Sequence, residues 1–130
     1  MIVGIAGGSG SGKTTVARKI ISELERKYAV NYLQQDSYYI DRSYLPAEDR
    51  EDINFDHPDS IDFELLINQL NLLKLKNPVD VPIYDFISHT RKSLTEKINP
   101  ATITIVEGIL LFTRKELIDL FDYKIDRKSV

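Results

Sequence analysis

Apolar positions along this chain follow two periods, and the alternation between them predicts the order of the structural elements. Runs rich in β-branched apolar residues at 2–6 and 102–106 are typical of buried parallel strands, and residues 29–34 are expected to form a further short strand. Apolar residues three and four positions apart predict helices over residues 14–27 and over about residues 61–77. Because strands alternate with helices, the pattern indicates an α/β fold around a parallel sheet.

The remaining segments carry weaker patterns. Residues 79–87 alternate apolar and polar, but Pro82 restricts them to an edge strand or an irregular extended segment. Residues 94–98 are expected to run back beside them as a hairpin. Residues 40–59 are polar and show no sustained period, so we expect a loop or a loosely helical excursion there, of the length that lids and binding loops have.

Capping residues and short elements are also expected. Asp59 or Ser60 is predicted to cap the second long helix. The T-x-x-E pattern that starts at Thr113 resembles a capping box and predicts a short helix over residues 114–121. Residues 122–125 begin a possible fourth strand. We expect a single domain, since 130 residues suffice for one core and no internal boundary is visible.

Composition narrows the class of function. The net charge of -3 without any basic block argues against nucleic-acid and anionic-membrane partners and favours a small-molecule substrate. No apolar stretch approaches the length of a bilayer span. The chain has no cysteine, which excludes disulfides, thiolate metal sites and a cysteine nucleophile. Met1 leads straight into the first strand without a basic leader, so we expect a soluble, cytoplasmic protein.

A glycine-rich motif joins the first strand to the first helix and fits G-x-x-x-x-G-K-[ST], the loop that binds nucleotide phosphates. Glycines allow successive backbone N–H groups to face one concavity, where the helix dipole adds positive potential. The alternative, a flexible Gly/Ser linker, does not explain the strand before it and the helix after it. The expected nucleotide-binding residues are Gly7, Gly8, Ser9, Gly10, Ser11, Gly12, Lys13, Thr14 and Thr15.

The motif implies ATP or GTP together with Mg²⁺. Lys13 is expected to reach the β- and γ-phosphates, and the Thr14 hydroxyl to be a ligand of Mg²⁺. Two carboxylates follow predicted strands, and ligands bind beyond the carboxyl ends of parallel strands. There Asp36 could accept a proton from an attacking hydroxyl, or simply cap a turn. Glu107 is expected to be an outer Mg²⁺ ligand through water, the alternative being an incidental strand-end glutamate.

Four segments with the phosphate loop among them, GIAGGSGSGKTT, QQDSYY, NFDHPDSIDFELL and PIYDFISHTR, are followed by IVEGIL. Together they closely resemble the uridine kinase (uridine–cytidine kinase) family of phosphate-loop kinases, over about residues 1–125. Phosphoribulokinases and bacterial pantothenate kinases are similar around the loop but lack the combination of FDHPDS with YDFxxHTR. A GTP-dependent switch would need a guanine-reading motif such as NKxD, which this sequence does not contain.

The resemblance implies a P-loop NTPase-type, three-layer α/β/α parallel sheet with a small β-hairpin and helical insertion that binds the nucleoside. It implies transfer of a phosphoryl group from ATP to the 5′-hydroxyl of uridine or cytidine, a step of pyrimidine salvage. By matching motif positions, Asp36 would be the catalytic base. Asp56 would bind the ribose hydroxyls.

The same resemblance assigns the walls of the nucleoside pocket. Tyr84 and His89 match residues that read the pyrimidine edge, and Tyr39 matches an aromatic that lines the pocket. Phe55 and Phe86 are expected to be its apolar walls. From the residues alone, His89 would be a solvated surface residue, and Tyr84 an edge-strand aromatic that covers the core.

The match ends at about Asp126. Family members continue with an arginine-rich lid and a final strand, whereas a single arginine, Arg127, stands here near a free end and is expected to be poorly fixed. The resemblance thus implies a domain shortened at the carboxyl-terminal edge of its sheet, either marginally stable or a homo-oligomer that covers this edge. The alternative function is that of a shortened, catalytically weak or inactive relative that binds nucleotide or nucleoside as a binding or regulatory protein.

Overall fold

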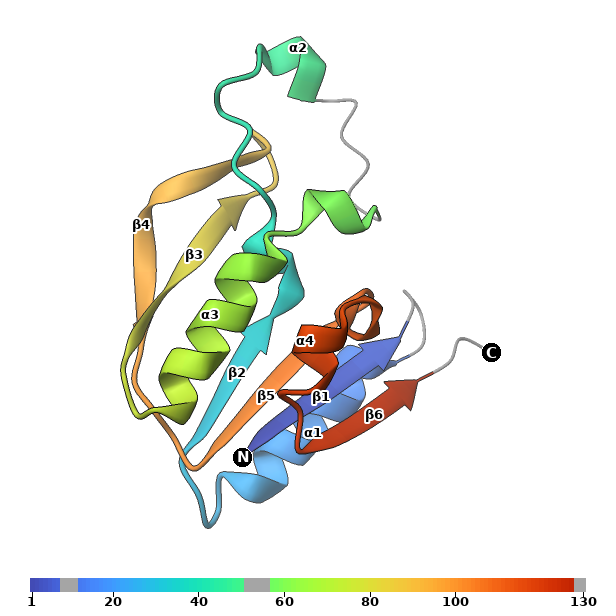
Figure 1. Ribbon diagram of the computed structural model, residues 1–130, viewed down its shortest axis with the longest axis vertical. Coiled ribbons are helices and arrows are strands. Elements are labelled where there is room, and N and C mark those ends of the chain that lie inside the picture. The colour runs from blue at the N-terminus through green and yellow to red at the C-terminus, as the bar shows by residue number, and fades with distance from the viewer. Residues whose placement is uncertain (8–11, 51–56, 128–130) are drawn as a thin grey trace.

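The computed structural model describes residues 1–7, 12–50 and 57–127, the side chains of Lys13 and Arg127 excepted. Within this part of the chain, parallel strands form a sheet in the order β2-β5-β1-β6 (Figure 1). The strand bounds are Val30–Gln34 for β2, Ile103–Gly108 for β5, Ile2–Gly7 for β1 and Tyr123–Arg127 for β6. The parallel sheet predicted from the β-branched runs is therefore confirmed.

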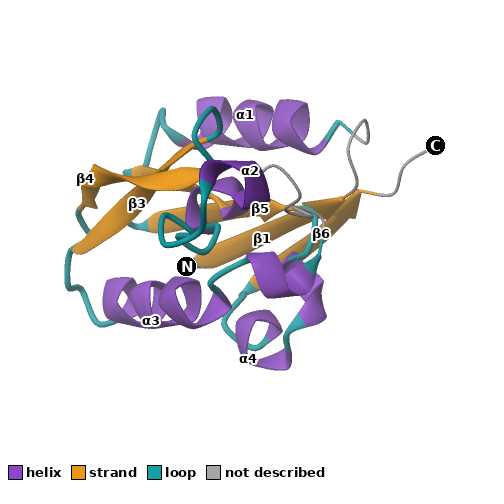
Figure 2. Ribbon diagram, turned by 90° about the horizontal axis from the view of Figure 1, so that it is seen from above, coloured by secondary structure: helices purple, strands orange, loops and turns teal. Residues whose placement is uncertain are grey.

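Helices cover both faces of the sheet (Figure 2). Helix α1 (Lys13–Leu24) lies on one face, where Ala17 packs against Val3 and Ile5 of β1. Because side chains alternate along a strand, Ile2 and Ala6 of β1 point to the opposite face, into the larger core cluster. Every residue of β1 and β5 is buried, which explains why these strands read as continuous apolar runs.

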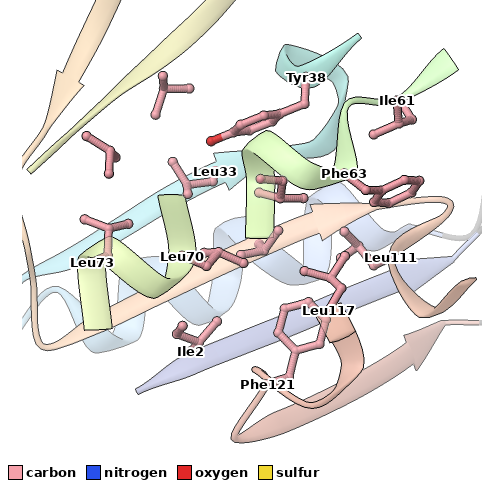
Figure 3. Close-up of a cluster of buried hydrophobic side chains, with 14 of the residues drawn as sticks. Ile2, Leu33, Tyr38, Ile61, Phe63, Leu70, Leu73, Leu111, Leu117 and Phe121 are labelled. Atoms are coloured by element: carbon pink, nitrogen blue, oxygen red, sulfur yellow. The ribbon is translucent and has the colours of Figure 1, made fainter. Parts of the chain in front are cut away.

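The second face is covered by α3 (Phe63–Lys74) and α4 (Lys115–Ile118) (Figure 3). The buried positions of α3 recur with helical spacing, as the sequence predicted. The ring of Phe121, which follows α4, lies over β1, where a Cβ added at Gly4 would stand 2.7 Å from it. Glycine is therefore needed at position 4 for this close approach. Fully buried members of the cluster include Leu66, Leu70, Leu111 and Leu117.

A hairpin of β3 (Val79–Asp85) and β4 (Thr90–Ile98) stands beside α3, apart from the parallel sheet (Figure 1). Its register shifts between Pro82 and Tyr84, as expected where proline interrupts a hydrogen-bonded ladder. The predicted hairpin is confirmed, and its second strand begins four residues earlier than the sequence pattern indicated. His89 lies in the turn and has a positive φ of 58°.

In its described part, the polar segment after β2 contains three single helical turns, η1 (Gln35–Tyr38), α2 (Ala47–Arg50) and η2 (Pro58–Ser60). Arg50 connects this excursion to the hairpin turn, because its Nε donates to the Ser88 carbonyl at 3.0 Å and its Nη1 to the Leu45 carbonyl at 2.7 Å. The predicted loosely helical excursion is confirmed for the residues that are described.

Two cap predictions are wrong. The α3 cap is Asp62, whose Oδ1 accepts a hydrogen bond from the Leu65 amide at 3.1 Å, whereas Asp59 and Ser60 belong to η2. The chain enters α3 later because the Asp62 amide is held by the Tyr38 carbonyl at 2.7 Å. Thr113 opens no capping box, since its hydroxyl donates backward to the Leu110 carbonyl at 2.8 Å.

The start of the last helix also differs from expectation. Helix α4 starts at Lys115, two residues after the predicted cap, with no side-chain capping bond at Arg114. The backbone of Arg127 pairs with Gly7 in the ladder between β1 and β6, while its side chain lies outside the described part, so the expectation that this arginine is poorly fixed stays a prediction. Strand β6 ends the strand order and Tyr123 on it is 60% exposed, so the predicted sheet edge is present among the described strands. Self-association across it stays a prediction.

A buried hydrogen-bond relay holds the hairpin, α3 and the turn after β2 together. The Tyr38 hydroxyl donates to Gln69 Oε1 at 2.7 Å, and Gln69 Nε2 donates to the Asp80 carbonyl at 2.7 Å. Tyr38 is fully buried and Gln69 is 5% exposed. Burial raises the pKa of Tyr38 far above its usual value, so the hydroxyl remains a donor.

Replacing Tyr38 by phenylalanine is expected to lower the free energy of unfolding by about 1–3 kcal/mol at neutral pH, because the Gln69 acceptor stays buried without its donor. The folded-state pKa of Tyr38 lies above the unfolded value. Its contribution is therefore full below about pH 10 and is lost as the pH rises toward the folded-state pKa. Urea unfolding at about pH 8 and about pH 11 measures both effects. If the wild-type chain and Tyr38→Phe lost the same unfolding free energy between these two pH values, the pH dependence could not come from Tyr38.

Candidate active site

The carboxyl ends of three parallel strands, β2, β5 and β1, lie side by side at one end of the sheet. Glu107 near the end of β5 is in register with Gln34 on β2 and with Ile5 on β1. Gly7 ends β1 two residues beyond that level, and Asp36 lies two residues after the end of β2, in the turn η1. The predicted catalytic base, the predicted metal ligand and the start of the phosphate loop therefore gather at the same edge.

The phosphate loop leaves β1 at Gly7 and enters α1 at Gly12. Gly12 has φ 81° and ψ 15°, a left-handed conformation that residues with a Cβ rarely adopt. The first turn of α1 has no acidic residue to offset the positive end of the helix dipole, which favours an anion there. Thr15 is exposed in this turn. Residues 8–11 and the Lys13 side chain lie outside the described part, so their predicted phosphate contacts stay predictions.

The two predicted metal ligands are in contact. The Thr14 hydroxyl donates to Glu107 Oε1 at 2.8 Å, across 93 residues of sequence. A hydroxyl oxygen and a carboxylate are ligands that Mg²⁺ prefers, and Mg²⁺ keeps several waters and takes few protein ligands. In the described ranges, no group of three or more histidine, cysteine, aspartate or glutamate side chains is placed to hold a metal ion. The donor set fits Mg²⁺ at Thr14 and Glu107.

The second oxygen of Glu107 is held from β2. Glu107 is 4% exposed, and its Oε2 accepts from the Tyr32 hydroxyl at 2.5 Å and from Gln34 Nε2 at 3.4 Å. Burial, and then the hydrogen bond to Glu107, raise the pKa of Tyr32 to about 12. Sequence reasoning missed both residues. The signal was their spacing of two at the end of a strand, which puts them on one face.

A cavity of about 320 Å³ lies between the end of β2 and the hairpin. It brings the exposed Asp36 carboxylate together with Tyr84 and Phe86, which the resemblance assigned to the nucleoside pocket. Sequence reasoning assigned no role to the other lining residues, although most of them lie in the segments that carry the family resemblance. The full lining is Gln34, Asp36, Ser37, Pro82, Ile83, Tyr84, Phe86 and Glu96.

Three aromatic rings form one wall beside Asp36. The Tyr39 ring centroid lies 5.2 Å from that of Tyr84 and 5.8 Å from that of Phe86, and the latter two are 5.0 Å apart. These tilted and edge-on arrangements are the favoured ones for aromatic pairs. The Tyr39 hydroxyl also donates to Asp36 Oδ1, at a long 3.5 Å. The structure thus brings together Asp36, Tyr39, Tyr84 and Phe86 from two distant segments.

Arg91 holds this wall in place. Its Nε donates to the Tyr39 carbonyl at 3.0 Å, and its Nη2 forms an ion pair with Asp62 Oδ2 at 3.2 Å. The guanidinium therefore links the hairpin, the chain after β2 and the cap of α3. His89 lies two residues before Arg91 in the turn. The predicted ribose ligand Asp56 and the predicted wall residue Phe55 lie outside the described residues.

Gln35, just before Asp36, is fully buried and packs on Gly108. Its Oε1 accepts from the Leu110 amide at 2.8 Å. An alanine Cβ at position 108 would stand 2.4 Å from Gln35 Cβ. We expect Gly108→Ala to lower the free energy of unfolding by about 1–3 kcal/mol, because Gln35 must move.

Urea unfolding of Gly108→Ala, Gln35→Gly and the double variant tests this close approach. We expect Gly108→Ala to cost less in the Gln35→Gly background, where the opposing Cβ is gone. An equal cost in both backgrounds would show that the contact does not determine the effect.

The sheet order, the strand–loop–helix unit and the pair of Thr14 with Glu107 are typical of the phosphate-loop kinase fold. A family model described as the Phosphoribulokinase / Uridine kinase family matches residues 2–127. The chain belongs to this family.

Similar proteins agree with that assignment. Uridine kinases of Lactobacillus helveticus and Ligilactobacillus salivarius are 46% and 47% identical to this chain over 125 residues, which are 96% of it. The chain spans 59% and 58% of the length of these two relatives. A structure described as a possible uridine kinase from Bacillus stearothermophilus has a TM-score of 0.75 at 25% identity, covering 97% of this chain and 69% of that chain.

The fold extends to more distant proteins. The phosphoribulokinase from Rhodobacter spheroides has a TM-score of 0.69 at 12% identity, with 96% of this chain and 50% of that chain covered. At this identity the likeness shows the fold alone. Among the described helices, none is both long and apolar enough to cross a membrane.

Proposed function

We propose that this chain transfers the γ-phosphoryl group of ATP to the 5′-hydroxyl of uridine or cytidine. The observation that carries the proposal is the cavity in which the Asp36 carboxylate faces the same space as Tyr84 and Phe86. This cavity lies at the carboxyl-terminal end of the sheet, where β1 leads into the phosphate loop. Support comes also from the relatives named uridine kinase.

In the proposed reaction, Asp36 accepts the proton of the nucleoside 5′-hydroxyl as that oxygen attacks the γ-phosphorus. The bond from the γ-phosphorus to the bridging oxygen breaks, and ADP leaves with the electron pair. Asp36 is exposed and lines the cavity, so a hydroxyl can reach its carboxylate. Tyr39, which donates to Asp36 Oδ1, restricts the orientation of the base.

On the nucleotide side, the chain supplies positive potential and positioning. We propose that Lys13 and the loop amides neutralise the charge of the transferred group, together with the amino end of α1. Thr14 and Glu107 would hold Mg²⁺, which when bound offsets negative charge on the phosphate oxygens. GTP is an alternative phosphate donor.

On the nucleoside side, Tyr84 and the exposed ring of Phe86 line the cavity that would take a planar base, and Tyr39 packs against both rings. The proposed contacts of Asp56 with the ribose and of His89 with the pyrimidine edge follow from the family resemblance. Such polar contacts would select pyrimidine nucleosides, because a base that leaves them unpaired loses affinity.

The test is the initial rate of nucleoside monophosphate formation from ATP with uridine, cytidine and guanosine, together with calorimetric binding of each nucleoside. We expect turnover with the pyrimidine nucleosides above that with guanosine. Tight uridine binding without product would instead support the alternative of a nucleoside-binding protein. If the chain neither bound nor phosphorylated any pyrimidine nucleoside, both the kinase function and the nucleoside-binding function would be overturned.

A further inference from the structure

Glu107 distributes its two oxygens between two parts of the fold. Oε1 accepts from the Thr14 hydroxyl on α1, and Oε2 accepts from the Tyr32 hydroxyl on β2, 75 residues away in sequence. At 4% exposure this carboxylate is nearly removed from water, so protein donors must replace its hydration. The orientation of Glu107 is thus set from both sides.

Tyr32 is itself held rigidly. It pairs with Ile105 in the ladder between β2 and β5, and its ring packs against the cluster of Val3 and Ile5. Gln34 Nε2 donates to the Tyr32 oxygen at 3.2 Å. The phenol hydrogen is therefore left for Glu107, and the direction of this hydrogen bond is fixed by its neighbours.

The orientation of Glu107 determines the orientation of the Thr14 hydroxyl. A threonine hydroxyl has one hydrogen and two lone pairs, and here the hydrogen is given to Glu107 Oε1. The lone pairs then remain available to a cation. If Glu107 turned, the hydrogen of Thr14 would turn with it, and the lone pairs would point elsewhere.

We propose that Tyr32 is a positioning residue of the magnesium–nucleotide site, acting through Glu107 to orient the Thr14 hydroxyl toward the cation. The inference rests on the proposed function insofar as it takes Thr14 and Glu107 as the magnesium side of that site. Partners of metal ligands commonly affect metal affinity in this way, by about 10–100-fold when removed. Tyr32 itself touches neither the cation nor the nucleotide.

The experiment measures ATP binding by calorimetry, with Mg²⁺ and with a chelator, for the wild-type chain and for Tyr32→Phe. Phenylalanine keeps the ring packing and removes the hydroxyl. We expect the gain in ATP affinity that Mg²⁺ gives to fall by about 10-fold, with metal-free ATP binding close to wild type. Tyr28→Phe is the matched control, because Tyr28 is an exposed tyrosine at the turn after α1.

A double-mutant cycle with Glu107→Gln separates positioning from a general structural effect. If Tyr32 acts through Glu107, Tyr32→Phe changes the Mg²⁺ dependence little in the Glu107→Gln background. An unchanged Mg²⁺ dependence in Tyr32→Phe, or an equal loss in both backgrounds, overturns this inference alone. Absence of any Mg²⁺-dependent ATP binding by the wild-type chain overturns the inference and the proposed function together.

Discussion

Asparagine at position 36 is expected to lower the rate of uridine phosphorylation by about 10²–10⁴-fold, the usual contribution of a positioned general base. The amide has nearly the shape of the carboxylate but cannot accept the proton of the 5′-hydroxyl. Because Asp36 is exposed at the end of β2 and lines the cavity without supporting the core, Asp36→Asn should fold normally. The measurement is steady-state formation of uridine monophosphate at saturating ATP.

The matched control is Asp80→Asn. Asp80 is an exposed aspartate on β3, the same hairpin that lines the cavity, but it is not among the lining residues. We expect the control to retain wild-type turnover and both variants to bind uridine as the wild-type chain does. Wild-type turnover in Asp36→Asn would exclude Asp36 as the base. A parallel loss of uridine binding would instead assign it a substrate-binding role.

Alanine in place of Phe63 is expected to lower the free energy of unfolding by about 3–5 kcal/mol, the largest stability effect that we predict. Phe63 is the first residue of α3 and is 1% exposed within the core cluster beneath the sheet (Figure 3). The Arg114 guanidinium lies over the Phe63 ring, with its Cζ 5.1 Å from the ring centroid. The substitution leaves a cavity and removes this cation–π contact.

Phe63→Leu is the control, since it keeps most of the apolar volume while removing the aromatic ring. We expect it to cost clearly less than Phe63→Ala in urea unfolding, with the m-value unchanged in both. A loss below about 1 kcal/mol for Phe63→Ala would mean that α3 closes around the space, and that the packing seen at its first turn contributes little.

The candidate site was predictable where one local pattern carries the chemistry. Gly7 and Gly12 belong to a motif that the sequence displays whole, and Asp36 follows a strand recognisable from its own residues. Glu107 was expected near the metal side for the same reason; it contacts Thr14, and its binding of Mg²⁺ stays a prediction. Each of these positions depends on a strand end, which short-range patterns locate well.

The site was not predictable where contacts join distant segments. Tyr32 looked like one more residue of a strand, and only the parallel pairing of β2 with β5 puts its hydroxyl on Glu107. Likewise, nothing local distinguishes Arg91 as the residue that holds the Tyr39 carbonyl, 52 residues away. The chain contains many acceptors for any one hydrogen-bond donor, and the tertiary structure determines which of them the donor meets.

The cap of α3 shows that a tertiary contact can also decide a local feature of the chain. The sequence predicted Asp59 or Ser60 as the cap, whereas Asp62, an equally good capping residue, caps α3. The carbonyl of Tyr38 decided the matter by binding the Asp62 amide. A tertiary contact thus moved the start of α3 to Phe63.

By itself, the sequence determined the α/β class, the phosphate loop, the hairpin and the placement of Asp36 at a strand end, because each follows from periodicity or from a contiguous motif. The tertiary structure decided which strands are neighbours, and with them the pair of Thr14 with Glu107 and the wall of Tyr39 beside Tyr84. The physical reason is that local patterns record burial and backbone preference. Contacts between side chains far apart in sequence depend on how the whole chain packs.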